Sequence, residues 1–145
     1  MRADTYLTKV RRFHEVFNHP LDKAEVHRDL DMLRYRLVEE EFKEYGDALE
    51  ELRYLLGVEA TEGPDDALAM RIEQARSHLL KEMADLIVVV VGHAAVRGWN
   101  IDVAFNRVMA SNMSKLGEDG KPIYREDGKI LKGPNYKEPN LKDLI

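Results

Sequence analysis

Two pairs of acidic residues constrain this sequence most, because each pair falls on an otherwise apolar helical face. Glu41 and Glu44 form the first pair, and Glu82 and Asp85 form the second. Residues three apart share one face of a helix, so each pair can present its carboxylates to a common point. If the two helices face each other, four carboxylates surround one cavity. Such a cavity is a site for hard cations.

The simplest alternative is that the first pair belongs to a solvated helix face. At about 100° per residue, the apolar residues of this segment fall on one stripe, namely Leu30, Leu33, Leu37, Ala48 and Leu55. Glu41 and Glu44 lie in the middle of that stripe, whereas Glu39 and Lys43 point away from it. Acids in an apolar stripe are strongly destabilising unless they are paired or bind a metal. We therefore expect Glu41 and Glu44 to be buried.

The second pair leads to the same expectation independently. Asp85 is the only formal charge in residues 83–96, a segment that is apolar on nearly all sides and is predicted to be buried. Glu82 precedes it by one turn. A salt bridge to a lysine or arginine of another helix is the alternative, and it stays open. All-carboxylate sites favour Mg²⁺ or Mn²⁺, whereas zinc would require histidine or cysteine nearby.

Hydrophobic periodicity predicts four helices, at residues 4–17, 23–56, 66–97 and about 100–116. We expect Asp4 or Thr5 to cap the first helix. Asn100 or Asp102 is expected to cap the fourth. Three glycines are expected to end the later helices: Gly57, Gly98 and Gly117. Glycine, proline and paired acids predict a loop at residues 57–66.

Residues 117–145 form a tail of different character, rich in glycine, proline and lysine and without a helical period. Residues 122–132 predict a small hairpin around Asp127-Gly128, a dipeptide that type I′ turns prefer. Residues 133–139 are expected to form an ordered or partly ordered loop. The prediction is an all-α, four-to-five-helix bundle with a short tail. It forms a single domain of residues 1–145, helical over about residues 4–116.

Bulk properties exclude several classes of protein. The 145 residues carry a net charge of -5, which argues against a nucleic-acid-binding surface. The absence of cysteine excludes disulfides, a thiolate nucleophile and a cysteine zinc site. The N-terminus does not resemble a signal peptide, and the longest apolar run, residues 86–91, is too short to span a bilayer. We expect a cytoplasmic protein with neither nucleic acid nor membrane as a partner.

The acidic residues also match a known pattern. Glu40-Glu41-Phe-Lys-Glu44, followed by Glu82-Met-Ala-Asp85, resembles the EExxE…ExxD signature of all-α nucleoside triphosphate pyrophosphohydrolases. That superfamily includes MazG proteins, phosphoribosyl-ATP pyrophosphohydrolases, dimeric dUTPases and dCTP pyrophosphatases. Asn112-Met-Ser-Lys115 resembles the family's NxxK element, and residues 13–17 resemble the FHxxF region of MazG-like members. The spacer between Glu44 and Glu82 is longer than usual, so the resemblance says least about residues 57–66.

The resemblance implies cleavage of a nucleoside triphosphate between its α and β phosphates, with release of pyrophosphate. It implies that Mg²⁺, or Mn²⁺ as a substitute, is held by Glu41, Glu44, Glu82 and Asp85. Glu40 would bind a further metal or orient the attacking water. Asn112 and Lys115 would contact the sugar or the phosphates of the substrate. A cation that stabilises a helix C-terminus is the alternative role for Lys115.

The substrate and the assembly state are less constrained. The tail resembles segments of MazG-like proteins that act in nucleotide-pool house-cleaning, so dUTP is the first candidate substrate. Phosphoribosyl-ATP is the nearest enzymatic alternative. A non-catalytic helical module that binds nucleotide or metal is a third hypothesis, although it would not need five acids. Apolar faces on several sides, together with the resemblance, predict a homodimer or homotetramer.

Overall fold

The structure, a computed structural model, describes residues 4–25 and 28–145. It contains four α-helices and one short 3₁₀ helix: α1 (Tyr6–Val16), α2 (Arg28–Glu62), α3 (Asp66–Arg97), α4 (Ile101–Met113) and η1 (Lys142–Leu144). Among the described residues there is no β-strand, and Tyr124 and Ile130 form an isolated β-bridge. The predicted all-α fold class is therefore confirmed.

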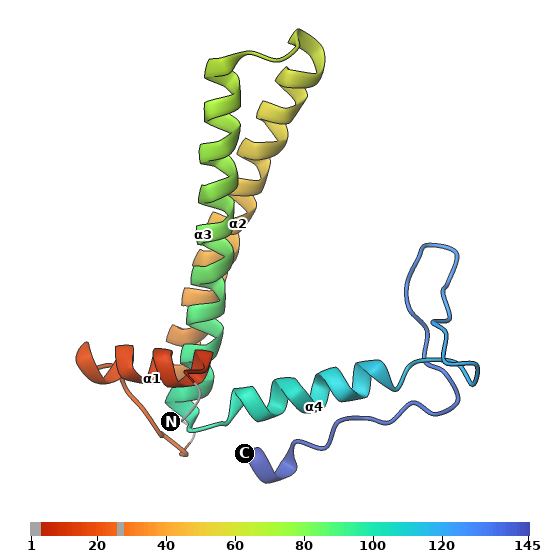
Figure 1. The fold of residues 1–145 in the computed structure, drawn as a ribbon. Coiled ribbons are helices and arrows are strands. Elements are labelled where there is room, and N and C mark those ends of the chain that lie inside the picture. The colour runs from red at the N-terminus through yellow and green to blue at the C-terminus, as the bar shows by residue number, and fades with distance from the viewer. Residues whose placement is uncertain (1–3, 26–27) are drawn as a thin grey trace.

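Helices α2 and α3 form a long antiparallel hairpin, and α1 lies across its open end (Figure 1). The predicted end of α2 at Gly57 is wrong, because the helix continues to Glu62. Glycine inside a helix is unfavourable by about 1 kcal/mol. Here the extra turn also places Val58 against the apolar cluster that joins the two helices, which offsets that loss. The connecting loop then needs only residues 63–65, and Gly63 takes a left-handed φ of 87°.

The start of α2 also differs from the prediction, since the helix begins at Arg28 instead of residue 23. The backbone N–H of Lys23 donates to the carbonyl of Val96 at 2.6 Å, so this segment is fastened to the end of α3. The bounds predicted for α3 are confirmed. Asp65 caps its N-terminus by accepting from the Leu68 N–H at 3.0 Å, and Gly98 ends it with φ of 74°.

Helix α1 packs on α3 at a glycine. Thr5 caps α1, accepting from the Thr8 N–H at 3.2 Å, so Thr5 is the N-cap of the two candidates. Val10 and His14 are the buried residues of α1. A Cβ at Gly92 would lie only 3.1 Å from Nε2 of His14, so the close approach of α1 to α3 depends on glycine at this position.

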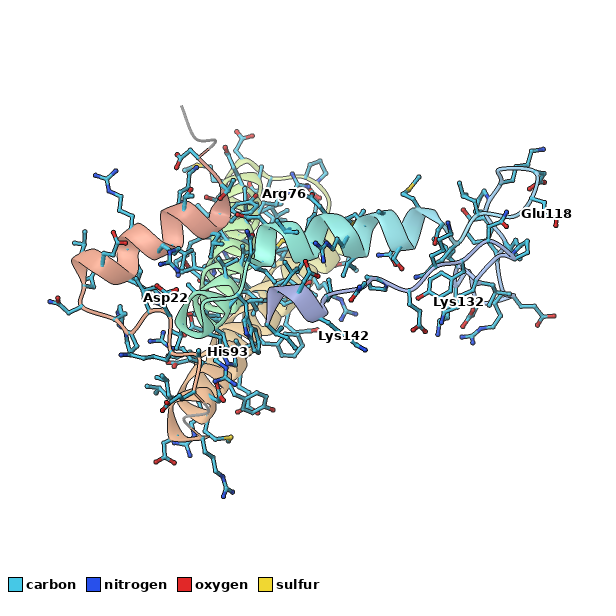
Figure 2. All side chains as sticks on the ribbon, turned by 90° about the horizontal axis from the view of Figure 1, so that it is seen from below. Asp22, Arg76, His93, Glu118, Lys132 and Lys142 are labelled. Atoms are coloured by element: carbon cyan, nitrogen blue, oxygen red, sulfur yellow. The ribbon has the colours of Figure 1, made fainter. Side chains whose placement is uncertain are left out.

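Helix α4 begins at its Asn100 cap and ends at Met113, three residues earlier than predicted. It projects away from the hairpin, and the tail folds back along it (Figure 1). Figure 2 shows Glu118 and Lys132 at the end farthest from the hairpin and Lys142 back near it. Ser111 Oγ donates to the Lys137 carbonyl at 2.7 Å, which fixes the returning tail to α4.

The tail turn at Asp127-Gly128 is not the predicted type I′ turn. Gly128 has a φ of 83°, whereas Asp127 has no positive φ, and type I′ requires positive φ at both central residues. The Gly128 N–H donates to the Arg125 carbonyl at 2.8 Å. The carboxylate of Asp127 accepts from the Lys129 N–H at 3.1 Å, which favours the observed turn.

The expectation that residues 83–96 of α3 are buried is only partly correct. Its buried residues include Val91, Ala94, Ala95 and Val96, but four apolar side chains are 39–46% exposed, namely Met83, Ile87, Val88 and Val90. One chain therefore leaves an apolar face uncovered. No helix among the described residues has both the length and the apolar character needed to cross a membrane.

Candidate metal and nucleotide site

The antiparallel hairpin brings three of the predicted acids together. One carboxylate oxygen from each of Glu41, Glu82 and Asp85 lies within 4.8 Å of the others. Glu82 is the buried member, with 2% of its side chain exposed, while Asp85 is 38% exposed. Glu82 follows the buried Ala75 by two turns and so shares the face of α3 that packs on α2. Asp85 lies at the edge of that face, which corrects the expectation of a buried aspartate.

Two other predicted acids, Glu44 and Glu40, lie outside this group of three. Both are exposed, so the expectation that Glu44 is buried is wrong. The apolar stripe of α2 is wider than the strip that α3 covers within one chain. Glu44 nevertheless lies close enough to Glu41 for its charge to raise the pKa of that carboxyl.

The electrostatics of the group favour a bound cation. Burial is the largest cause that raises the pKa of Glu41, and the like charges of Glu44, Asp85 and Glu82 raise it further. The buried Oε2 atoms of Glu41 and Glu82 have no hydrogen-bond partner. Oxygen-only donors, concentrated negative charge and two unpartnered buried oxygens are what a hard divalent cation requires. The residues present therefore fit such an ion.

The alternative, a salt bridge to a lysine or arginine of another helix, is not found for these acids among the residues that the structure describes, and the ammonium that contacts two of them belongs to the same helix. Lys81 Nζ lies 2.9 Å from Oε1 of Glu82 and 2.9 Å from Oδ2 of Asp85. These two hydrogen bonds raise the pKa of Lys81 well above its usual range. His78 Nε2 lies 3.0 Å from the same Glu82 oxygen. Glu41 has no ion pair with any residue that the structure describes, so the contacts of Lys81 and His78 account for only part of the group.

Asn112 and Lys115 lie at the far end of α4. Lys115 Nζ donates to Oδ1 of Asn112 at 2.8 Å, and the Lys115 carbonyl accepts from the Gly133 N–H at 2.9 Å. Helix α4 leads away from the hairpin (Figure 1), and no hydrogen bond or ion pair joins either side chain to the three carboxylates among the described residues.

Comparison with known families agrees with this geometry. A family model described as the MazG nucleotide pyrophosphohydrolase domain matches residues 30–119. The chain belongs to the MazG family. It is therefore a nucleoside triphosphate pyrophosphohydrolase of a metal-dependent family, and its substrate is a nucleotide. A comparison with curated proteins gives no match.

The MazG match covers both carboxylate pairs and the Asn112–Lys115 element, and it leaves α1 and most of the tail outside. Three further residues on or near the site were not singled out from the sequence. Lys81 and His78 lie four residues before Asp85 and Glu82, a spacing that predicts contact on a helix. Arg34 is buried with its Nε unpartnered, two turns before Glu41 on the same face of α2.

Proposed function

We propose that this MazG enzyme converts a nucleoside or deoxynucleoside triphosphate, with dUTP as the first candidate, to the monophosphate and pyrophosphate. Its role would be to remove non-canonical nucleotides from the cellular pool. The observation that carries the proposal is the group of three carboxylates from two helices, within 4.8 Å of one another. The choice of dUTP is supported by the resemblance of the tail to segments of MazG-like house-cleaning proteins. All 145 residues are proposed to form one domain.

The proposed cofactor is Mg²⁺, with Mn²⁺ as a substitute. Its ligands would be Glu41, Glu44, Glu82 and Asp85, with the exposed Glu44 joining from the solvent side. A bound divalent ion offsets the charge that develops on the leaving pyrophosphate and lowers the pKa of bound water. The exposed Glu40, which precedes Glu41 on α2, is proposed to orient the attacking water. In that position its carboxylate accepts the hydrogen bond that directs the water oxygen toward the phosphorus.

The proposed assembly is a homodimer or homotetramer. Asn112 and Lys115 are proposed to bind the sugar or phosphates of the nucleotide, and α4 carries them away from the carboxylates of their own chain. We therefore propose that they serve the site of a neighbouring copy. The uncovered apolar side chains of α3 support an assembly of this kind, because large exposed apolar patches mark interaction surfaces.

The reaction is tested by measuring pyrophosphate release from a panel of triphosphates with Mg²⁺, with Mn²⁺ and with chelator. The panel includes dUTP, dCTP, dTTP, the ribonucleotides, oxidised purine nucleotides and phosphoribosyl-ATP. The expected result is metal-dependent pyrophosphate release, with dUTP the fastest. Faster turnover of phosphoribosyl-ATP would replace the proposed substrate and keep the reaction. Release of orthophosphate without pyrophosphate would contradict the reaction itself.

A further inference from the structure

Lys81 is a cation that contacts two of the three grouped carboxylates. Its ammonium lies 2.9 Å from both Glu82 and Asp85, and 62% of its side chain is exposed. The Lys81–Asp85 ion pair is accessible to solvent, whereas the side chain of Glu82 is only 2% exposed. The ammonium therefore sits over the carboxylates on the side from which a charged substrate can approach.

A divalent cation and this ammonium compete for the same carboxylates. Mg²⁺ binds carboxylate oxygens at about 2.0–2.1 Å. An ion held by Glu82 and Asp85 would thus lie within a few ångströms of Lys81 Nζ. Like charges at that separation repel each other, and the repulsion is stronger in a partly buried site than in water. Even where the metal uses the unpartnered Oε2 of Glu82, its binding places a second cation beside the ammonium and draws charge from both carboxylates. Binding of the metal alone therefore weakens both ion pairs of Lys81 and offers the ammonium no other anionic partner.

We propose that Lys81 is a phosphate-binding residue that exchanges partners, from Glu82 and Asp85 to the polyphosphate of the nucleotide, when metal and substrate bind together. This inference rests on the proposed function. The exposed, flexible side chain can leave the carboxylates without rearranging the helix. A lysine ammonium forms strong charge-assisted hydrogen bonds with phosphate oxygens. Metal and nucleotide consequently assist each other's binding, and the metal alone binds weakly.

The first test measures Mn²⁺ affinity by electron paramagnetic resonance, without nucleotide and at low ionic strength. Lys81→Gln removes the competing ammonium, and we expect it to bind Mn²⁺ about tenfold more tightly than the wild type. Lys81→Arg keeps the charge and should retain an affinity close to that of the wild type. The matched control is Lys43→Gln, because Lys43 lies on α2 two residues from Glu41 and pairs with Asp47 at 3.9 Å. Lys43→Gln should change the Mn²⁺ affinity by no more than about twofold.

The second test measures KM for the triphosphate that the wild type turns over, at saturating Mn²⁺. Lys81→Gln should raise KM about tenfold, and Lys43→Gln should leave it unchanged. Tighter Mn²⁺ binding with an unchanged KM would overturn the exchange of partners.

The outcomes separate this inference from the proposed function. Mn²⁺ binding by the wild type that Glu82→Gln abolishes would support the metal site. If Lys81→Gln then binds Mn²⁺ no more tightly than the wild type, the inference is overturned and the metal site stands. If the wild type binds no Mn²⁺, the metal site and the inference both fail.

Discussion

At the scale of single residues, His14 makes the stability of the fold depend on pH. Its ring is buried, and Nδ1 lies 3.1 Å from the Pro20 carbonyl. Burial lowers the pKa of His14 below 6.5, although the contact with Pro20 opposes this shift. As pH falls, the unfolded chain therefore binds this proton before the folded chain does. The contribution of His14 to the free energy of unfolding is full above pH 6.5 and declines below it.

This prediction is checked by urea denaturation at about pH 8 and about pH 5.5. The wild type should lose stability on acidification, and His14→Gln should lose less, because the amide does not titrate. Comparing the loss within each protein cancels the fixed effect of the substitution on packing. An equal loss in both proteins would show that His14 does not cause the pH dependence.

The grouping of the acids could be predicted from the sequence, but the burial of each acid could not. Helical spacing placed each acid pair on one helix face, and facing helices would bring four carboxylates to one cavity. The structure brings Glu41, Glu82 and Asp85 together. Glu44 lies on the same stripe but is exposed. Its exposure could not be predicted, because the sequence of one helix does not reveal how much of its apolar face a partner covers. The contact of Lys81 with Asp85 was available from the i, i+4 spacing.

At the scale of elements, two glycines of the hairpin, Gly57 and Gly63, should respond in opposite ways to substitution by alanine. A Cβ at Gly57, inside α2, would meet nothing within 4 Å. Gly57→Ala should therefore raise the free energy of unfolding by about 0.5–1 kcal/mol, since alanine has the higher helix propensity. Gly63 has a φ of 87°, which strains any residue with a Cβ, so Gly63→Ala should lower the free energy of unfolding by about 1–2 kcal/mol.

Thermal denaturation of both variants checks this pair of predictions, with an upward shift of Tm for Gly57→Ala and a downward shift for Gly63→Ala. A lower Tm for Gly57→Ala would mean that a neighbouring chain approaches α2 at this position. An unchanged Tm for Gly63→Ala would mean that the loop can adopt another conformation.

The tail depends on Gly133 for its contact with the segment that follows α4. A Cβ at this position would overlap with the carbonyl group of Leu116, and the Gly133 N–H donates to the Lys115 carbonyl. Gly133→Ala should therefore loosen the tail and free the backbone of Lys137, which is bonded to Ser111 and Ser114, for several-fold faster cleavage by trypsin. Glu138→Ala, at an exposed residue of the same segment, serves as the control. Equal cleavage rates in the two variants would argue against the docking of the tail through Gly133.

A helix end could be predicted from the sequence where a capping residue and the limit of the hydrophobic period coincide. Both ends of α3 were predictable, because the Asp65 cap and Gly98 lie where the hydrophobic period starts and stops. The end of α2 was not, because Gly57 resembles a terminator while contacts from α3 extend the helix past it. That extension also explains the long spacer between Glu44 and Glu82, which forms the outer part of the hairpin.

At the scale of the whole molecule, the uncovered apolar surface predicts an oligomer. A cavity of about 860 Å³ opens between α1, α3 and α4, lined in part by Ile87, Val90 and Phe105. The chain mass is 16.7 kDa, so sedimentation should give at least twice that value, about 33 kDa. Phe105→Glu should shift the protein toward the monomer. A wild-type protein that sediments as a monomer at micromolar concentration would contradict the proposed assembly.

The direction of α4 is the feature that the sequence predicted least. Its limits follow from the Asn100 cap and from the local pattern of apolar residues, but nothing local specifies the angle at which it leaves α3. That angle determines whether Asn112 and Lys115 can reach the carboxylates of the same chain. In the proposed assembly, contacts with another copy would decide this angle, and one sequence does not reveal such contacts.

The central claim is that the carboxylates of α2 and α3 hold the metal for pyrophosphate release. The most direct measurement compares Mg²⁺-dependent turnover of Glu41→Gln and Asp85→Asn with that of Glu39→Gln, an exposed acid on the other side of α2. We expect the first two to lose about a thousandfold or more, roughly 4 kcal/mol, with the helical fold and mass unchanged. Glu39→Gln should keep wild-type activity. Near-normal turnover in either Glu41→Gln or Asp85→Asn would contradict the account.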